Sequence, residues 1–316
     1  MPHHKKVLVV HYSQSGQLDD AIRYCILPLL NDKSVSVTDL RLKPSKPFPF
    51  PWNVLDFLSV FPESVYCDKI SLEPFDINKN EEFDLIILAY QVWFLSPSLP
   101  MSSFLQSAEA KTWLNDKPVI TFIACRNMWL TAQEKMKRLI AQNGGVLCDN
   151  IALIDGGNSL ETFITTPRWL LTGKKDKFWF FSSAGVKKSD MENSARFGRA
   201  ISGALKNDIE KSKRPLLKGL GAVNVNEKLI MSEKIGHRSF LIWGKLLKKI
   251  GKPKSRIRRV FICIYLLFLV LMIITVVPLT LLLRALFYPL IIKKLKKQKA
   301  YYEEPSGSEN FKENNE

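Results

Sequence analysis

Short apolar runs recur along the first half of the chain and are separated by longer amphipathic stretches. Val7–Val10, Asp84–Tyr90 and Pro118–Ala124 are almost wholly apolar, as strands buried on both faces are. Ser34–Leu40 alternates between apolar and polar positions, and Cys148–Ile154 has a similar composition. The pattern predicts five strands.

Helical patterns occupy the intervals between these runs. They cover Leu18–Leu30, Ser102–Leu114 and Thr131–Asn143, the last of which stops at Gly144-Gly145 as helices often do. A further helix fits Ser189 to about Lys213. Strands buried on both faces that alternate with helices predict an α/β doubly wound sheet.

One connection, Lys43–Phe83, is too long for a simple link between two elements. It is rich in proline and aromatic residues. Two interpretations remain open: a surface insertion with its own small apolar cluster, or a lid or wall over a ligand site.

The composition changes after Lys213. Pro215–Asn226 has the character of a linker, and Glu227–Ile250 intersperses apolar residues with lysines. Such a segment suits either a helix at a membrane interface or a helix packed on the globular domain. Val260–Leu283 then runs for twenty-four residues without a charge, and about twenty are enough to cross the hydrocarbon core. We therefore predict a membrane-inserted C-terminal helical segment.

The path of this segment is left open by the sequence. Taken straight, residues 260–292 would span roughly 50 Å at about 1.5 Å per residue, which is too long for one crossing. Both ends are lysine-rich, so a hairpin bent near Pro278 would keep both in the cytoplasm. One crossing followed by an interfacial helix is the alternative. The acidic end of the chain, Glu303–Glu316, is expected to be disordered.

These features predict four regions. A sheet domain covers residues 1–213 with an insertion at 43–83, and a linker with a basic amphipathic helix covers 214–259. The transmembrane or hairpin segment covers 260–292, and a basic-then-acidic cytoplasmic tail covers 293–316.

The charge of the chain points to an anionic partner. Lysine and arginine number 46 against 30 acidic residues, a net charge of +16, and Lys245–Arg259 holds eight basic residues and no acid. Because an apolar run follows directly, this segment favours anionic lipid head groups and not nucleic acid.

Cysteine and histidine spacing excludes several classes of site. The five cysteines are scattered without a C-x-x-C pair, and no zinc or haem arrangement can be assembled with the four histidines. Only four apolar residues precede the first polar stretch, so no secretory signal is expected and the globular part should remain in the reducing cytoplasm.

The turn after the first strand carries the clearest chemical signal. It reads Ser13, Gln14, Ser15, Gly16, Gln17 and Leu18 and leads directly into a helical pattern. Backbone amides at the start of a helix, small residues and hydroxyls together suit an anion such as a terminal phosphate. The dinucleotide and P-loop fingerprints are both absent.

This turn resembles the FMN phosphate loop of flavodoxins and flavodoxin-like quinone reductases, which runs S/T-x-S/T-G-x-T. Leu18 replaces the final hydroxyl, which removes one expected phosphate contact. The resemblance implies a flavodoxin-like parallel five-stranded sheet in the order 2-1-3-4-5, with FMN as the cofactor.

Two later loops fit the same resemblance, since the flavin ring of such proteins lies against the loops after the third and fourth strands. These loops are Ala89–Leu105 and Ala124–Gln133. Arg126 and Asn127 are candidate donors to the pyrimidine edge, where charge develops on reduction. The candidate flavin contacts from both loops are Gln91, Val92, Trp93, Phe94, Arg126, Asn127, Met128 and Trp129.

A narrower resemblance appears when four segments are read together. HYSQSGQL, PFPFPW…FPESV, LAYQVWFLSPSLP and FIACRNMWLTAQ are similar to the dialkylresorcinol condensing enzyme family of bacterial pigment clusters, over roughly Val7–Pro167. However, the chain has no cysteine on a nucleophile turn with two histidine partners, so it lacks a ketosynthase apparatus.

The resemblance therefore implies the companion step, in which an amphipathic cyclohexanedione is oxidised to a resorcinol lipid. Tyr90 and Arg126 are the candidate catalytic residues, with Arg126 as an anion stabiliser. A ketosynthase partner and a place at the bacterial inner membrane, with the globular domain in the cytoplasm, complete the expectation. Two alternatives remain: an NAD(P)H quinone reductase, and a non-catalytic adaptor that holds a synthase at the membrane.

Overall fold

Five parallel strands form the central sheet, in the order β2-β1-β3-β6-β7. They are β1 (Lys5–His11), β2 (Val35–Arg41), β3 (Leu85–Tyr90), β6 (Pro118–Cys125) and β7 (Val146–Ile154). Numbered along the chain, this is the order 2-1-3-4-5 of a flavodoxin-like fold, which confirms the predicted fold class. The computed structural model describes residues 4–157, 161–253 and 255–307.

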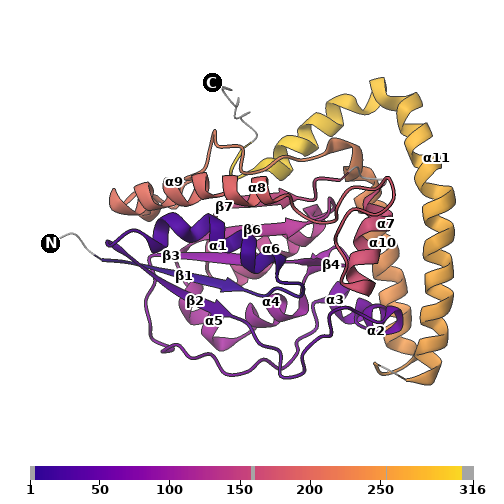
Figure 1. Cartoon of the computed structure of the whole chain (residues 1–316), viewed down its shortest axis with the longest axis horizontal. Helices are drawn as coiled ribbons and strands as arrows, with labels where there is room; N and C mark the ends of the chain where they lie inside the picture. The colour runs from indigo at the N-terminus through magenta and orange to yellow at the C-terminus, as the bar shows by residue number, and fades with distance from the viewer. Residues whose placement is uncertain (1–3, 158–160, 254, 308–316) are drawn as a thin grey trace.

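Helices cover both faces of the sheet (Figure 1). Val7 and Val9 face one helical layer and Leu8 and Val10 face the other, because successive side chains of a strand point to opposite faces. The first layer contains α1 (Gln17–Leu30), α8 (Lys188–Asn193) and α9 (Ala195–Lys206). The second layer contains α4 (Leu99–Phe104), α5 (Ala108–Leu114) and α6 (Leu130–Gln142).

The long insertion contributes to the core of the sheet domain and also to a second, smaller apolar cluster. Trp52 and Phe83 belong to the same apolar core as Leu8 and Tyr90 of the sheet. The insertion also forms α2 (Val54–Ser59) and α3 (Phe61–Tyr66), and a small hairpin of β4 (Val92–Trp93) and β5 (Ser96–Pro97) lies next to α3. Leu58, Phe61 and Val65 of the insertion also belong to a smaller apolar cluster, which they form with Leu247, Ile262 and Tyr265.

The segment after the sheet domain packs against it through α10 (Glu227–Ile250). The Glu233 carboxylate accepts hydrogen bonds of 2.6 Å from the backbone amide and the hydroxyl of Thr131, at the start of α6. Phe240 and Leu247 pack with Phe61 of the insertion. Of the two interpretations of this segment, the structure supports packing on the domain. Two further helices precede it: α7 (Thr162–Thr172) and the 3-10 helix η1 (Ile209–Ser212).

The last helix, α11 (Arg256–Glu303), runs along α10 and then bends back over the domain (Figure 1). Within it, Arg256–Thr275 is long and apolar enough to cross a membrane. Its start is fixed by Arg258, which is 1% exposed and forms a bidentate ion pair with Glu63, at 2.9 and 2.6 Å. Tyr265 stacks on Phe61 with the ring centroids 4.6 Å apart.

The C-terminal end of α11 returns to the sheet domain. The Ser306 hydroxyl donates to Asp149 at 2.9 Å and accepts from the Asn150 amide at 2.7 Å. Glu303 accepts from the Val225 amide at 3.2 Å. Residues 303–307 are therefore ordered, which corrects the expectation of disorder from Glu303 onward; residues 308–316 lie outside the described part of the chain.

These contacts place both ends of the apolar segment on one body. Arg258 at the start and Ser306 just beyond the end both contact the globular domain. A hairpin-like path that leaves the domain and returns to it is compatible with these contacts. The hairpin and the single crossing both stay predictions, and the return of the chain to the domain favours the hairpin.

Candidate functional site

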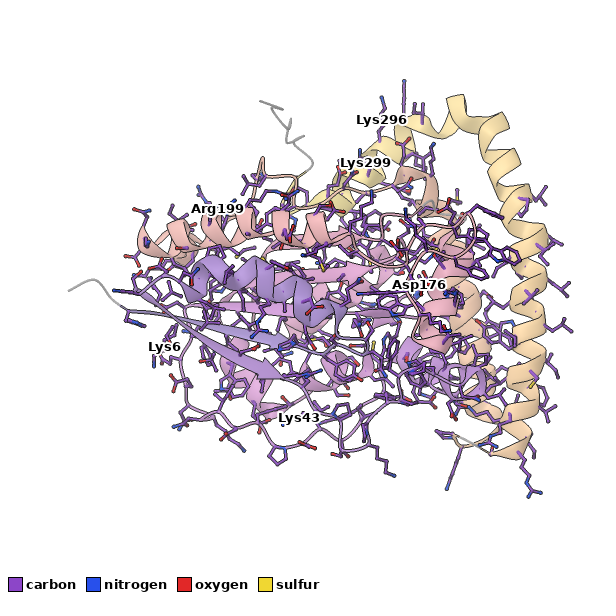
Figure 2. All side chains as sticks on the ribbon, viewed as in Figure 1. Lys6, Lys43, Asp176, Arg199, Lys296 and Lys299 are labelled. Carbon is purple, nitrogen blue, oxygen red and sulfur yellow. The ribbon has the colours of Figure 1, made fainter. Side chains whose placement is uncertain are left out.

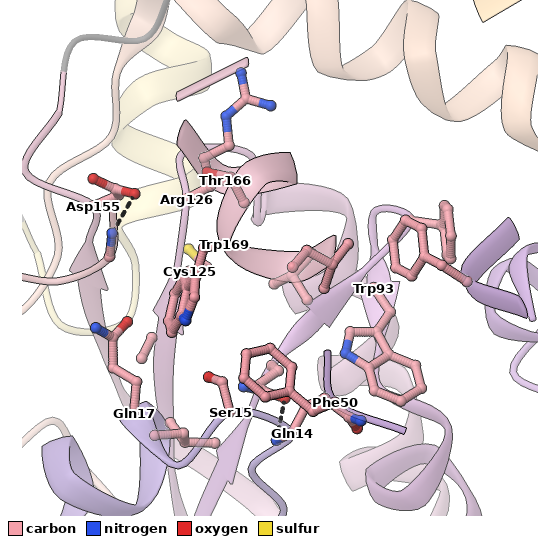
Figure 3. A pocket seen from close by; sticks show the side chains of 18 residues that line it. Gln14, Ser15, Gln17, Phe50, Trp93, Cys125, Arg126, Asp155, Thr166 and Trp169 are labelled. Carbon is pink, nitrogen blue, oxygen red and sulfur yellow. Dashed lines mark hydrogen bonds between the residues drawn. The ribbon is translucent and has the colours of Figure 1, made fainter. Parts of the chain in front are cut away.

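Three loops meet at the carboxyl edge of the sheet around one hollow of about 190 Å³, which we call the edge hollow (Figure 3). They follow β1, β3 and β6, so the hollow lies where the strand order reverses. Among the lining residues these loops supply Gln14, Ser15, Gln17, Leu18, Gln91, Val92, Trp93, Phe94, Cys125 and Arg126. The sequence prediction brought together the same three loops.

The turn after β1 has the shape expected of an anion-binding loop. Gly16 has a φ of 84°, in the left-handed region that only glycine adopts without strain, and it is the N-cap of α1. Within the described part of the chain, the backbone amides of Ser15 and Gly16 have no hydrogen-bond partner. Both amides lie at the positive end of α1.

Ser13 and Leu18, which the sequence predicts as phosphate contacts, are hydrogen-bonded to each other. The Ser13 hydroxyl is buried and accepts a hydrogen bond of 3.2 Å from the Leu18 amide. This bond stabilises the turn from within and engages the Leu18 amide, and Ser13 does not line the edge hollow. The backbone amide of Gln14 also has a partner, since it donates a hydrogen bond to the side-chain oxygen of Gln91 at 2.9 Å.

The insertion forms one wall of the edge hollow. The Gln14 side chain donates to the carbonyl oxygens of Phe48, at 3.0 Å, and Pro49, at 2.6 Å, which ties the insertion to the turn. Phe50 and Phe57 then line the hollow. The structure thus supports the interpretation of the insertion as a wall over a ligand site.

Aromatic rings make up much of the remaining wall. Trp93 is only 8% exposed and packs edge-on against Phe48, with the ring centroids 5.0 Å apart. Trp169 of α7 meets Phe50 edge-on, at 6.3 Å. Sequence reasoning placed Trp93 at the site but missed Phe50 and Trp169 as individual contacts.

A segment that the sequence did not implicate closes the remaining side. Asp155 follows β7 and accepts hydrogen bonds from the amides of Gly157, at 2.9 Å, and Gly185, at 2.8 Å. The Gln17 side chain accepts from the Val186 amide at 3.2 Å. Asp155 and Gly185 line the hollow, although no local motif identifies them.

Arg126 is the positively charged residue among those that line the edge hollow. Its Nε donates to the Thr162 hydroxyl at 2.6 Å, and its guanidinium lies 3.9 Å from the centre of the Phe163 ring. Burial lowers the pKa of Arg126 to about 10, while Asp155 acts in the opposite direction. The side chain therefore stays charged at neutral pH, and in Figure 3 it extends away from Ser15.

Tyr90 is not at the site. Its side chain has no exposed surface, and its hydroxyl donates to Gln133 at 2.7 Å inside the core. Burial raises the pKa of this hydroxyl well above its usual value. The prediction of Tyr90 as a catalytic residue is therefore corrected, because its side chain lies under α6 and lines neither the edge hollow nor the second cavity described below.

The loop after β6 contributes fewer contacts than predicted. Trp129 is 1% exposed and belongs to the core, and Asn127 lines neither cavity of the described structure. Met128 lines the second cavity described below. Cys125 lines the edge hollow, but burial raises the pKa of its thiol, so it is not a thiolate at neutral pH.

A second, larger cavity of about 440 Å³ adjoins the edge hollow, and we call it the apolar chamber. The two cavities share lining residues, including Phe94, Cys125 and Arg126. The chamber lies among α7, α10 and α11.

The comparisons with known proteins return likeness to solved structures only. No protein-family model and no curated protein matches the chain. A flavoprotein in complex with FMN from Lactobacillus acidophilus is 17% identical, with a TM-score of 0.38, over 47% of this chain and 93% of its own. A flavodoxin from the domain Archaea is 14% identical, with a TM-score of 0.36, over 64% of this chain and 99% of its own. Likeness at this level adds no conclusion about function, and the fold class rests on the observed strand order.

Proposed function

We propose that the edge hollow binds FMN and that the chain is an FMN-dependent oxidoreductase. The observation that carries the proposal is the convergence of three loops on one hollow, with the Gly16 turn at the start of α1. The amides of Ser15 and Gly16 and the Ser15 hydroxyl would hold the terminal phosphate. This is the set of donors that a phosphate monoester requires.

The residues present fit a flavin in chemistry, and the ring would extend from the edge hollow to the wall that the hollow shares with the apolar chamber, which leaves the part of the chamber between α10 and α11 free. The edge hollow alone, at about 190 Å³, is smaller than the roughly 300–1,000 Å³ typical of ligand sites. The adjoining chamber adds about 440 Å³ behind shared walls. Trp93, Phe50 and Trp169 provide apolar ring faces around the hollow.

Bound FMN would supply a hydride acceptor. The aromatic walls would exclude water from the ring, and the Arg126 cation would stabilise negative charge that develops on an enolised substrate. Cys125, which lines the same cavities as Arg126, has a raised thiol pKa and remains neutral. The chain would therefore position and polarise a substrate without forming a covalent bond to it.

We assign the substrate to the amphipathic cyclic diones, which lose two hydrogens to become resorcinol lipids. The hydride would pass to the flavin and the proton to solvent, with aromaticity as the driving force. Support comes from the sequence resemblance over Val7–Pro167 and from the apolar chamber beside the hollow. Since the chain lacks condensing residues, a separate ketosynthase would supply the dione.

We place the protein at the cytoplasmic face of the bacterial inner membrane. Figure 2 shows side chains on α11 that point away from the domain. The exposed apolar residues recur at helical spacing: Ile257, Val260, Ile264, Leu267, Leu271 and Ile274. The basic segment Lys245–Arg259 precedes and overlaps the start of this face, and suits anionic head groups. Both features support a lipid contact.

The test is the absorbance spectrum of the full chain purified in detergent, with and without added FMN. We expect flavin bands in the parent and about ten- to a hundredfold weaker FMN binding in two variants: Ser15→Ala removes a hydroxyl donor to the charged phosphate, and Gly16→Ala strains the turn, because Gly16 has a φ of 84°. Gly203→Ala is the control: Gly203 also has open space around its Cα, but it lies in α9. A colourless parent that takes up no FMN would overturn the redox assignment and leave the adaptor.

The substrate class is tested separately. Under anaerobic conditions, a cyclic dione should bleach the flavin and yield a resorcinol lighter by two hydrogens, measured by mass spectrometry. Bleaching by NADPH with a quinone as acceptor, and none by the dione, would instead identify a quinone reductase.

A further inference from the structure

Three helices supply most of the lining of the apolar chamber, and most of the lining side chains are apolar. α7 contributes Phe163, Pro167 and Leu170, and α11 contributes Phe268, Leu269, Met272 and Ile273. From α10 come Ser232, Ile235, Gly236, Ser239 and Phe240. Its lining is therefore that of a site for hydrocarbon.

The chamber exists because large side chains fill the space between α10 and α11 near the start of α11, whereas small side chains leave this space open further along. Near the start of α11, Trp243 and Leu247 pack closely with Ile262 and Tyr265. Further along, the α10 face changes to Ser232, Gly236 and Ser239, whose side chains are too small to fill the space. A Cβ at Gly236 would meet only Leu95, at 3.6 Å, which is ordinary contact.

One end of the chamber joins the edge hollow. Phe94, Cys125 and Arg126 line both cavities, so a ligand in one can continue into the other. Arg126 is the charged residue at this junction, held by Thr162 and the Phe163 ring. A molecule with a polar ring and an apolar chain matches this arrangement, with the ring near Arg126 and the chain among the apolar residues of the chamber.

The other side of the chamber is α11 itself. Leu269 and Met272 face the chamber, whereas Leu267 and Leu271, on the opposite face, are 62% and 52% exposed. One helix therefore separates the chamber from the outward apolar face that we assign to lipid. A hydrocarbon chain that leaves the bilayer would stay in apolar surroundings.

We propose that the apolar chamber binds the hydrocarbon chain of an amphipathic ligand whose polar ring lies at the junction with the edge hollow, beside Arg126. The placement of the ring rests on the proposed function, whereas the chain site rests on the chamber alone. Burying two methylenes is worth about fifteenfold in affinity, at about 0.8 kcal/mol each, so a filled chamber would contribute strongly to selection of long-chain ligands.

The test uses photolabelling of the full chain in lipid nanodiscs. The probe is a resorcinol with an undecyl chain that carries a diazirine near its end. We expect crosslinks on residues 232–240 of α10 and 268–273 of α11, located by mass spectrometry. A fatty alcohol that carries the same diazirine, which has no ring, should label these residues less.

Gly236→Phe should fill the chamber and reduce these crosslinks at least about fifteenfold, the value of two excluded methylenes. It should not unfold α10, because glycine is the less favourable residue inside a helix and a Cβ at this position makes only an ordinary contact, with Leu95 at 3.6 Å. Gly203→Phe on α9 is the matched control and should leave the crosslinks unchanged. Melting curves in the same nanodiscs check the folding of both variants.

Two results separate the chamber from the proposed cofactor. Crosslinks confined to Ile264, Leu267 and Leu271, or unchanged by Gly236→Phe, would overturn the chain site even if the protein binds FMN. Crosslinks in the chamber of a protein that binds no FMN would support the chain site and overturn the proposed function.

Discussion

At the scale of single residues, His11 is a buried cation between two carboxylates. It is 5% exposed, with Nδ1 2.8 Å from Asp19 and Nε2 2.9 Å from Asp39. Burial lowers its pKa, but the two carboxylates outweigh burial and raise the pKa to about 9. His11 ends β1, directly before the turn that holds the proposed phosphate site.

This pair of contacts predicts a stability that depends on pH. Because the folded-state pKa lies above the value of about 6.5 in the unfolded chain, the stabilisation is complete below pH 6.5 and is lost as pH rises through 9. We expect a loss of roughly 1–3 kcal/mol over this range, reduced by solvent screening at the exposed Asp39. Melting temperatures at fixed detergent and salt measure it, and His11→Gln should flatten the slope between pH 6.5 and 9. An unchanged slope in that variant would assign the dependence to other groups.

Tyr90 shows how the position of a side chain along a strand decides its role. It is the last residue of β3, at the edge where the ligand loops begin. The alternation of the strand nevertheless directs its side chain to the face covered by α6, where Gln133 accepts its hydrogen bond. Proximity in sequence to a site loop did not place this side chain in the site.

At the scale of elements, the insertion holds α11 on the domain. Arg258 of α11 pairs with Glu63 of α3, and its guanidinium also donates to the Ser59 carbonyl at 3.2 Å. An arginine that is 1% exposed needs these partners, because a buried charge without them is unfavourable. The insertion thus has two structural tasks, as wall of the edge hollow and as support for α11.

We predict that Glu63→Gln destabilises the anchoring of α11 by about 3–5 kcal/mol, because it leaves the Arg258 charge buried without its counterion. Hydrogen exchange should increase at residues 255–266 and at α3, while β1 and β3 keep their protection. Arg259→Met is the control, since Arg259 is the exposed neighbour. Equal exchange in both variants would contradict a structural role for the pair.

At the scale of the whole molecule, both ends of the apolar segment lie on one side of any membrane that it enters. We infer this from the contacts of Arg258 and Ser306 with the same domain. Lys296 and Lys299 lie on the returning limb of α11 (Figure 2), which adds positive charge on the domain's side.

Cysteine accessibility tests this arrangement. In a Cys263→Ser background, we expect a membrane-impermeant maleimide to label both Lys252→Cys and Lys297→Cys in inverted inner-membrane vesicles, and neither in intact spheroplasts. Both positions are exposed, on the two sides of the apolar segment. Detergent-solubilised protein, in which both should react, controls for local reactivity. Labelling of the two positions from opposite sides would contradict the returning path.

Several features were predictable because they depend on local periodicity. The spacing of apolar residues predicts the strands of the sheet and the helices α1 and α6. The glycine in the motif predicts the turn before α1, and the structure gives Gly16 a φ of 84°. The convergence of the three loops also follows, since the carboxyl ends of parallel strands share one edge.

The tertiary structure decided what periodicity cannot. Phe50, Trp169 and Asp155 reach the edge hollow from segments far from the three loops, and no local pattern marks them. The sequence could not say which surface the apolar faces of α10 and α11 would cover, because burial against lipid and burial against protein require the same residue types. Only the packing on Phe61 and the return of Ser306 to Asp149 decided that, since specific contacts depend on shape and hydrogen bonding as well as on hydrophobicity.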